Sequence, residues 1–592
     1  MAEPALLQVE ALSVSYRAGA AVDGVSFTLA RGRCLGVIGE SGAGKSQAFL
    51  ALLGLLPAPA RVSGTARLDG VELLSAPHAA RGRDAAIIFQ DPLTALTPHL
   101  RIGDQIAEPL VTHRGMSWRD ARQRAAQLLE QVRMSDVPRR LRQYPHELSG
   151  GMRQRAMIAM ALACDPKLLI ADEPTTALDV SVQAQILVLL RELIAERNMA
   201  LALITHDMGV IAALADDVLV MRRGSVVERG AIGEILATPR HEYTRALLAA
   251  TPSMETAAPA ARARVEPAPL VVRNLGVNYR LHDGWLRPAR ELLAVSDVSF
   301  EVGAGEALGI VGESGSGKST LARALLRLGP VSSGDIVWLG RPMRQLSGEA
   351  MRALRADLQI VFQDPFASLD PTMSVAECVA EPLRALRPSM DDAQRGARVA
   401  RVLESVGLGA EFSERRSPTL SGGQCQRVAI ARAMILAPKL LVCDEAVSAL
   451  DVSIQAQILD LLATIKREHG TSLIFVSHNL AVVRQLCERV MVMYLGRVVE
   501  VGPTENLFRA PRHPYTRLLL DSVPLLDPVR ARERPQRLVA GETPSAVDRP
   551  TGCAFHQRCP AARERCATVS PEPEAVDQSH QVACLRWREL EN

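Results

Sequence analysis

Two glycine-rich segments of the chain have the composition and spacing of a phosphate-binding loop. GESGAGKS spans residues 39–46, and GESGSGKS spans residues 312–319. Each follows a short apolar run and precedes a helix-like segment. In that context the glycines allow successive backbone N–H groups to face the β- and γ-phosphates at the positive end of a helix. Both segments are therefore predicted to bind a nucleoside triphosphate.

Each loop ends in a lysine and a serine that would complete this chemistry. The lysines, Lys45 and Lys318, would contact the phosphates, and the serines, Ser46 and Ser319, would bind Mg²⁺. The chain has only five lysines, so a lysine at both loop positions is an informative match. The residues predicted to surround the triphosphate are Gly39, Glu40, Ser41, Gly42, Ala43, Gly44, Lys45, Ser46 and Gln47 in the first loop, and Gly312, Glu313, Ser314, Gly315, Ser316, Gly317, Lys318, Ser319 and Thr320 in the second.

An apolar run that ends in two acids follows each loop. The pairs are Asp172-Glu173 and Asp444-Glu445. The first carboxylate is placed to hold Mg²⁺, and the second can polarise an attacking water as a general base. Acids at a strand end are common on protein surfaces, but after a phosphate-binding loop they indicate triphosphate hydrolysis.

These motifs belong to a long internal repeat. Matching motifs recur 272 or 273 residues apart: the phosphate loops, FQDP (Gln90 and Gln363), LSGG (Ser149 and Ser421), the acid pairs, the later histidines (His206 and His478), and HEYTRALL with HPYTRLLL. Six matches in one register indicate a tandem duplication. Each copy is predicted to be an α/β domain, because apolar strand-like runs alternate with helix-like segments.

The repeat sets the predicted domain boundaries. The first copy spans residues 1–252, a Pro/Ala/Arg-rich linker spans 253–269, the second copy spans 270–530, and a tail without a counterpart spans 531–592. The register breaks once, after Tyr279, where residues 280–290 are predicted to be an insertion that widens a hairpin.

Composition excludes several classes of protein. The net charge of +3 gives no electrostatic reason to expect nucleic acid as a partner. The N-terminus is acidic where a signal peptide would be basic. No run reaches the roughly 18 apolar residues of a membrane span. If the protein works at a membrane, other chains are expected to form the passage.

The segment between the loop and the acids carries a specific family resemblance. It reads LSGGMRQR at 148–155 and LSGGQCQR at 420–427. LSGGQ is the signature of ATP-binding cassette (ABC) proteins, and its serine and glycines open a helix that could bind an anion. TTALDVSVQAQIL, VSALDVSIQAQIL, the HEYTRALL and HPYTRLLL ends and the tail segment GCAFHQRCP resemble the fused ATPases of peptide-type ABC importers.

The resemblance implies a fold and two composite ATP sites. Each copy would be a P-loop NTPase cassette with a RecA-like α/β core and a helical subdomain. In this family the signature of one cassette faces the γ-phosphate of ATP held by the other. One site would join 39–46, Gln90, Asp172, Glu173 and His206 with Ser421, Gly422, Gly423 and Gln424. The other would join 312–319, Gln363, Asp444, Glu445 and His478 with Ser149, Gly150, Gly151 and Met152.

The same resemblance assigns further roles. Gln90 and Gln363 match the glutamines that sense Mg²⁺ and water, while His206 and His478 match the switch histidines. Asp179 and Asp451 match the aspartates that lie across the interface, and Tyr16 and Tyr279 are predicted to stack on adenine. Three residues depart from the pattern, namely Met152, Gln47 and Ala446. None replaces a lysine, magnesium ligand, base or histidine, so both sites are predicted to hydrolyse ATP.

The implied system is an importer with separate membrane parts. ATP and Mg²⁺ are the expected cofactors. The expected partners are two transmembrane permease subunits and an extracytoplasmic solute-binding protein, with this chain peripheral at the cytoplasmic face of a bacterial plasma membrane. The regions 91–109 and 364–382 are the predicted permease contacts. Di- and oligopeptides are the expected solutes, and glutathione, nickel or another small solute is the alternative.

The cysteines fall into two groups. Six are scattered, mostly in apolar runs, and are expected to be reduced core residues. The other four lie close together in the tail: Cys553, Cys559, Cys566 and Cys584. Four thiolates suit a [4Fe–4S] cluster, which members of the resembled family carry at such a tail. Zinc and unliganded cysteines are the alternatives, although close C-x2-4-C pairs are absent.

A different class of protein has to be weighed against the importer. Soluble twin-cassette ATPases that act on ribosomes carry a long charged helical linker or N-terminal iron–sulfur ligands. Here the linker is short and Pro/Ala-rich, and the cysteines are C-terminal. Cassette ATPases of DNA repair would need coiled-coil heptads or large zinc-bearing insertions, which do not appear.

Overall fold

The structure is a computed structural model in which residues 5–17, 19–176, 178–260, 267–281, 290–448, 450–534, 541, 544–547 and 549–590 are described. The chain divides into two compact units. The first comprises Met1–Thr251, Asp451–Ser453 and Ser522–Leu538. The second comprises Pro252–Leu450, Ile454–Asp521 and Val539–Asn592.

The first unit contains two sheets that share one core. The antiparallel sheet runs β2-β1-β4-β5, with β1 (Ala5–Tyr16), β2 (Gly19–Ala30), β4 (Arg61–Leu68) and β5 (Val71–Glu72). Inward residues of β1 pack with Val37 and Ile170 of the second sheet. This alternation of buried and exposed residues is typical of a strand with one solvated face.

The second sheet holds the strands that lead into the predicted motifs. It runs β10-β9-β3-β8-β7-β6, and all neighbours are parallel except β9 and β10. The bounds are β3 (Cys34–Ile38), β6 (Ala85–Ile88), β7 (Leu168–Asp172), β8 (Ala200–Ile204), β9 (Asp217–Arg222) and β10 (Ser225–Ala231). Strands β3, β7 and β8 are buried along their whole length, which explains their unbroken apolar sequence.

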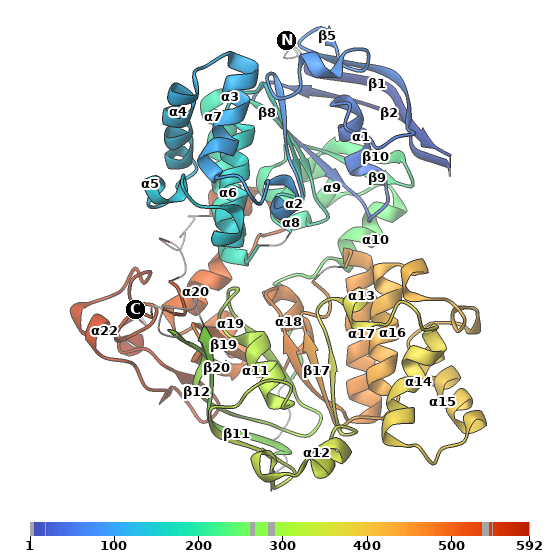
Figure 1. Ribbon diagram of the computed structural model, residues 1–592, viewed down its shortest axis with the longest axis vertical. Helices are drawn as coiled ribbons and strands as arrows, with labels where there is room; N and C mark the ends of the chain where they lie inside the picture. Colours follow the sequence, from blue (N-terminus) through green and yellow to red (C-terminus); the bar gives the residue numbers. More distant parts are fainter. Residues whose placement is uncertain are drawn as a thin grey trace. The chain divides into compact units, whose positions relative to one another are not determined.

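Helices cover this sheet and form a separate group beside it. Three of them, α3, α4 and α6, pack on one another, as Figure 1 shows, around residues such as Ile106, Leu128 and Ile158. The helices are α1 (Lys45–Leu52), α2 (Pro92–Ala95), α3 (Ile102–Arg114), α4 (Trp118–Gln131), α5 (Val137–Arg140), α6 (Gly150–Ala161), α7 (Val180–Arg197), α8 (Met208–Leu214), α9 (Ile232–Ala237) and α10 (Glu242–Ala250). The expected division into an α/β core and a helical part is confirmed.

A segment from far along the sequence completes the first unit. Helix α21 (Pro528–Glu533) packs against α8, and Ala531 joins the core of the helical group. The Arg532 guanidinium donates a hydrogen bond to the Ala215 carbonyl oxygen at 2.5 Å. The compact units therefore follow packing, whereas the boundaries predicted from the repeat follow sequence similarity.

The second unit repeats the architecture. Its antiparallel sheet runs β12-β11-β14-β15, with β11 (Leu270–Leu281), β12 (Arg290–Val302), β14 (Ser333–Trp338) and β15 (Arg341–Pro342). The other sheet begins β16-β17-β18-β13-β19-β20, with β13 (Ala307–Val311), β16 (Leu358–Val361), β17 (Leu440–Asp444), β18 (Ser472–Val476), β19 (Arg489–Tyr494) and β20 (Arg497–Pro503). The helices are α11 (Lys318–Leu325), α12 (Gly348–Leu354), α13 (Pro365–Ser368), α14 (Val375–Leu386), α15 (Asp392–Ser405), α16 (Gly422–Met434), α17 (Val452–His469), α18 (Leu480–Leu486), α19 (Thr504–Arg509) and α20 (Pro514–Asp521).

The Cys-rich tail is built into the second unit. Strand β22 (Gln581–Val582) pairs antiparallel with β20, and β21 (Glu574–Ala575) pairs with β22. These strands extend the parallel-core sheet beyond β20, where the corresponding sheet of the first unit ends at β10. Helix α22 (Glu564–Thr568) carries the buried Cys566 (Figure 1).

Several further expectations can be compared with the fold. β11 and β12 form a hairpin in which Leu281 pairs with Arg290, while the rest of the predicted insertion, 282–289, lies outside the described residues, as do 261–266 of the linker. In the part of the chain that the structure describes, no helix has the length and apolar character needed to cross a membrane. The six scattered cysteines are all buried and free, as expected.

Candidate active sites

The two phosphate loops have the backbone that their glycines require. Each lies between a buried strand and a helix, β3 and α1 in the first unit and β13 and α11 in the second. Gly44 has φ 92° and Gly317 has φ 98°, in the left-handed region. A Cβ at Gly44 would clash with the carbonyl oxygen of Ala21, so neither conformation nor space allows a side chain there.

The loop lysines point back into their loops. Lys45 Nζ donates hydrogen bonds to the carbonyl oxygens of Gly39 (2.7 Å) and Glu40 (2.9 Å). Lys318 Nζ donates to Gly312 O (2.8 Å) and Glu313 O (2.9 Å). Burial lowers the pKa of Lys45, against the opposing effect of nearby carboxylates. Each ammonium is therefore enclosed by the loop in which a phosphate would lie.

Tertiary structure brings each loop serine to its predicted partner. Ser46 Oγ donates to Asp172 Oδ1 at 2.8 Å, and Ser319 Oγ donates to Asp444 Oδ1 at 2.7 Å. Burial raises the pKa of both aspartates. Among the described residues no group of three or more His, Cys, Asp or Glu side chains could hold a metal ion. The assignment of these residues to Mg²⁺ stays a prediction.

The predicted general bases have the predicted glutamines and histidines around them. Gln90 Nε2 donates to Glu173 Oε2 at 2.8 Å, and His206 Nδ1 lies 3.2 Å from Glu173 Oε1. Burial alone would raise the pKa of Glu173, but the hydrogen bond and charge of His206, with smaller contributions from Thr176 and Lys45, together outweigh burial and lower that pKa. The carboxylate is therefore kept ionised, as a base requires.

The second site repeats this arrangement with small differences. Gln363 Nε2 donates to Glu445 Oε2 at 2.9 Å, and His478 Nδ1 lies 3.6 Å from the same oxygen. The pKa of Glu445 is likewise lowered: burial, the largest single effect, raises it, but the hydrogen bond and charge of His478 and the charge of Lys318 together outweigh burial. Glu173 and Glu445 adopt φ of 47° and 50°, a strained conformation for glutamate that occurs mainly at functional sites.

The signature serines cap the helices predicted to bind an anion. Ser149 Oγ accepts from Met152 N (3.3 Å) at the start of α6, and Ser421 Oγ accepts from Gln424 N (3.3 Å) at the start of α16. The Gln424 side chain returns a bond by accepting from Ser421 N at 2.9 Å, whereas methionine offers no such acceptor. Both serines are exposed. Their pairing with ATP on the other cassette stays a prediction.

The remaining predicted residues have more limited support. The Tyr16 hydroxyl donates to the Gln47 side chain at 2.5 Å, so one departure from the family pattern has a local partner. Tyr279 is half-buried at the matching place on β11. Within the first compact unit, Asp451 accepts a hydrogen bond from Ser41 N at 2.8 Å. Stacking on adenine and the roles of Asp179 and Asp451 stay predictions.

Two tyrosines were missed as site residues. The Tyr243 hydroxyl accepts from Glu40 N at 3.0 Å, and the Tyr515 hydroxyl accepts from Glu313 N at 2.9 Å. They therefore support the phosphate loops directly. Their signal was present in HEYTRALL and HPYTRLLL, which were used to align the repeats and to support the family resemblance but not to predict site residues.

An arginine of the tail was missed as well. Arg558 donates to Glu313 of the second phosphate loop through Nη1 (2.6 Å) and Nη2 (3.0 Å). Both side chains are buried. Nothing in the spacing of the sequence connects two residues that lie 245 positions apart.

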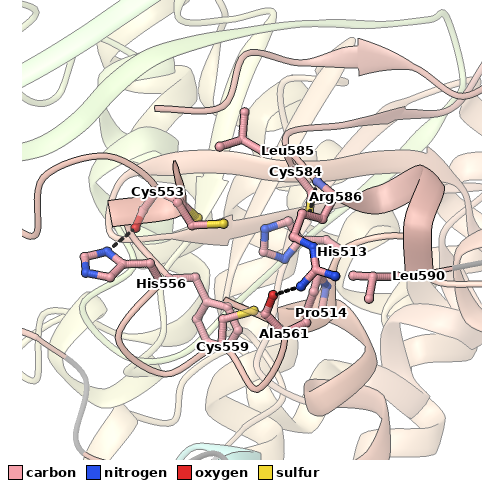
Figure 2. A pocket seen from close by; sticks show the side chains of 12 residues that line it. His513, Pro514, Cys553, His556, Cys559, Ala561, Cys584, Leu585, Arg586 and Leu590 are labelled. Carbon is pink, nitrogen blue, oxygen red and sulfur yellow. Dashed lines mark hydrogen bonds between the residues drawn. The ribbon is translucent and has the colours of Figure 1, made fainter. Parts of the chain in front are cut away.

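The four tail cysteines line one pocket together with His513, His556 and Arg586 (Figure 2). Burial raises the pKa of Cys553 and Cys559, and raises that of Cys584 to about 11. Four thiols are a donor set that metal cofactors use, but the described residues form no group of His, Cys, Asp or Glu that could hold a metal ion. Neither zinc nor an iron–sulfur cluster is therefore shown, and the cluster stays a prediction.

Two family models match the chain. The ABC transporter model matches residues 22–176 and 295–448. The model of the oligopeptide/dipeptide transporter C-terminal region matches residues 227–274 and 499–566. Each model matches once in either half, which agrees with the tandem repeat.

Curated relatives match over nearly the whole chain. The glutathione import ATP-binding protein GsiA of Escherichia coli K12 is 46% identical, with 92% of this chain and 93% of that protein covered. GsiA of Pectobacterium atrosepticum is 45% identical, with 93% of this chain and 95% of that protein covered. Among solved structures, cbiO1 of Clostridium perfringens, part of the ABC transporter complex cbiONQ, is 31% identical over 41% of this chain and 92% of its own, with a TM-score of 0.37.

Proposed function

The chain belongs to the ABC transporter family as a fused, ATP-hydrolysing subunit of the peptide-type import systems, and from this premise we propose that ATP at two composite sites drives the uptake of small peptides. The observation that carries the proposal is the duplicated hydrogen-bonding set. In both units a serine meets an aspartate and a glutamine meets the adjoining glutamate.

Each site has residues for every part of the hydrolysis. The loop amides and Lys45 or Lys318 would bind the phosphates, and Mg²⁺, which neutralises phosphate charge when bound, would be held by Ser46, Asp172 and Gln90 or by Ser319, Asp444 and Gln363. Glu173 or Glu445 accepts a proton from the attacking water. His206 or His478, beside the glutamate, contacts the γ-phosphate and keeps the base ionised.

Each site is completed by the signature of the other cassette. The N-terminal N–H groups of α16 and α6 face outward and carry partial positive charge, which suits a γ-phosphate. ATP binding would close the cassettes around two nucleotides, and hydrolysis with product release would reopen them.

Permease subunits would receive this motion next to the glutamines. In the regions 91–109 and 364–382, Leu93 is 52% exposed and Phe366 is 49% exposed. Each region thus presents a large apolar side chain that would be available for a contact with another protein. We place the chain at the cytoplasmic face of the membrane, with two permease subunits and a solute-binding protein as partners.

The proposed solutes are di- and oligopeptides, and glutathione is the alternative with the strongest support because the matched relatives are named for it. Purification with the membrane partners, followed by ATPase assays with a peptide panel, glutathione and Ni²⁺, tests the choice. Stimulation by peptides or glutathione would support the proposal. Copurification with ribosomes instead of permease subunits would overturn it.

The proposal also includes a [4Fe–4S] cluster held by Cys553, Cys559, Cys566 and Cys584. Support comes from the convergence of all four side chains on one pocket. When bound, the cluster would supply thiolate–iron bonds that join separate segments of the tail. Because burial raises the pKa of Cys553, Cys559 and Cys584, these three thiols would release protons on binding.

Iron and acid-labile sulfide in anaerobically purified protein test the cluster. Both should be present and should be lost in Cys559→Ser. The matched control is Cys425→Ser, which changes a buried cysteine outside the tail. Iron-free protein that contains zinc, or no metal at all, would contradict the proposal.

A further inference from the structure

We propose that the Cys-rich tail is a working part of the second ATP site, in which Arg558 acts as a positioning residue for the phosphate loop through Glu313. The inference rests on the proposed function, since it requires that this loop binds ATP. It assigns to the tail a role at the nucleotide that the cysteines alone do not imply.

The contact between tail and loop is short, double and buried. The two terminal nitrogens of Arg558 donate to the two carboxylate oxygens of Glu313 at 2.6 and 3.0 Å. Arg558 is 5% exposed and Glu313 is 2% exposed. Arg558 Nη1 also donates to the Tyr494 hydroxyl at 3.3 Å. A bidentate pair of this kind restricts both position and orientation.

Glu313 connects this pair to the residues that bind phosphate. Its backbone N–H donates to the Tyr515 hydroxyl at 2.9 Å, and its carbonyl oxygen accepts from Lys318 Nζ at 2.9 Å. The side chain held by Arg558 and the carbonyl that holds the lysine therefore belong to one residue. A shift of the Glu313 side chain would be transmitted to the loop backbone and to the lysine.

The tail is anchored firmly enough to hold the arginine in place. Phe555, three residues before Arg558, packs on the rings of Tyr494 and Tyr515 with centroids 5.2 Å away in each case. His580 Nε2 lies 2.9 Å from Glu500 Oε1 in a buried contact, next to the pairing of β22 with β20. Arg558 is thus presented by packed structure rather than by a free loop.

The first loop is supported in another way. Glu40 corresponds to Glu313, and Arg222 occupies the position of Tyr494, with its guanidinium carbon 4.9 Å from the centre of the Tyr243 ring. In the part of the chain that the structure describes, no lysine or arginine lies within ion-pair distance of the Glu40 carboxylate. The requirement for an arginine should therefore apply to the second site alone.

Site-specific ATP affinity tests the proposal in the full-length chain. Lys45→Ala removes binding at the first site and Lys318→Ala removes it at the second, so each background reports one site. Arg558→Met is placed in both backgrounds, and a fluorescent ATP analogue with Mg²⁺ is the probe. Arg565→Met, which changes an exposed arginine of the same tail, is the matched control.

In the Lys45→Ala background, Arg558→Met should raise the Kd of the analogue about tenfold, because small displacements of positioning groups have large effects on a site. In the Lys318→Ala background the Kd should not change, and Arg565→Met should change neither. Arg558→Lys should restore part of the affinity. An equal Kd for Arg558→Met and its parent at the second site, in protein that stays folded, would overturn the proposal.

A second variant covers the case in which Arg558→Met fails to fold. Loss of one partner leaves a buried charge uncompensated, whereas Arg558→Met with Glu313→Gln removes both charges. This double variant should fold and still bind the analogue more weakly at the second site, and wild-type affinity would overturn the proposal. No binding by Lys45→Ala itself would refute the ATP site proposed above, and this inference with it.

Discussion

The phosphate loops at 39–46 and 312–319 carry the same chemistry on different supports. Both loops enclose a lysine, and in both a serine hydroxyl donates a hydrogen bond to an aspartate. In both, the backbone N–H of the loop glutamate donates to a tyrosine hydroxyl. Around the second loop alone, the described structure adds a tail arginine on the glutamate side chain and an aromatic cluster beneath it. The duplication has thus kept the reacting groups while the surrounding structure has diverged.

The difference shows where change is tolerated in a duplicated ATPase. A replaced base or lysine would remove a step of the reaction, so the two copies match there. The residues that contact the loop from outside can change as long as the loop keeps its backbone conformation. Four predictions test how far the equivalence of the two units extends.

The general bases should be equally necessary. Glu173→Gln and Glu445→Gln keep the size of the side chain but remove the proton acceptor, and each should lower hydrolysis at its own site by about a thousandfold. The measurement is phosphate release at saturating ATP in the complex with permease subunits. An unchanged rate in either single variant would refute the equivalence of the sites.

The second unit should be the more sensitive to acid. Burial lowers the pKa of His513 to about 4, with Glu500 opposing. The unfolded chain takes up this proton below about pH 6.5, whereas the folded chain does not until about pH 4. The free energy of unfolding should therefore fall by roughly 3 kcal/mol as pH drops through that window, and change no further from this group below it.

Urea unfolding at pH 7.5, 5.5 and 4.5 measures this effect. His513→Asn keeps an acceptor for the Tyr515 N–H but does not titrate, so its loss of stability with acid should be smaller. His241→Asn is the matched variant in the first unit, where the half-buried ring accepts from Tyr243 N at 3.1 Å. Equal acid sensitivity of wild-type protein and His513→Asn would contradict the prediction.

The two tyrosines predicted to stack on adenine, Tyr16 and Tyr279, should differ in what their hydroxyls contribute. Tyr16→Phe removes the bond to Gln47 and should weaken ATP binding at the first site about fivefold, since a hydrogen bond contributes roughly 1 kcal/mol. Tyr279→Phe at the second site should have a smaller effect, because Thr320 stands where the first loop has Gln47. The measurement is the Kd for ATP in the Lys318→Ala and Lys45→Ala backgrounds. A larger effect of Tyr279→Phe than of Tyr16→Phe would contradict the prediction.

The smallest expected effect lies at the signature helices. Met152→Gln should create at α6, together with Ser149, the same capping box that Ser421 and Gln424 form at α16. The change should stabilise the first unit by about 0.5 kcal/mol. Gln424→Met should destabilise the second unit by a similar amount. Thermal unfolding measures the change in stability of both variants. A change in the same direction for both would show that the capping box is not responsible.

The sequence predicted the parts of each site that lie in continuous motifs. A phosphate loop is a local structure whose glycines, lysine and serine are set by backbone geometry. The repeat then related distant motifs, so that Asp172 and Gln90 could be assigned to the same site as Ser46. The α/β fold followed from the same pattern, and its helical part from the family resemblance.

Other contacts were beyond the reach of sequence reasoning. Arg558 lies in a segment that is read most easily for its cysteines, and its partner belongs to a motif that appears complete without it. The residues of α21 follow the second cassette in sequence but pack against α8 of the first unit. Neither pairing is local or repeated, so spacing carried no information about it.

By itself, the sequence determined the family and the motifs of this protein: two phosphate loops, the predicted magnesium ligands and bases that follow them, and two signatures in one register. Those features depend on residue types within short stretches, where covalent geometry limits the arrangement. Only the tertiary structure decided which residues outside the motifs support each loop. Burial and charge pairing act between residues that meet only after folding, which is how a tail arginine comes to lie on the second loop.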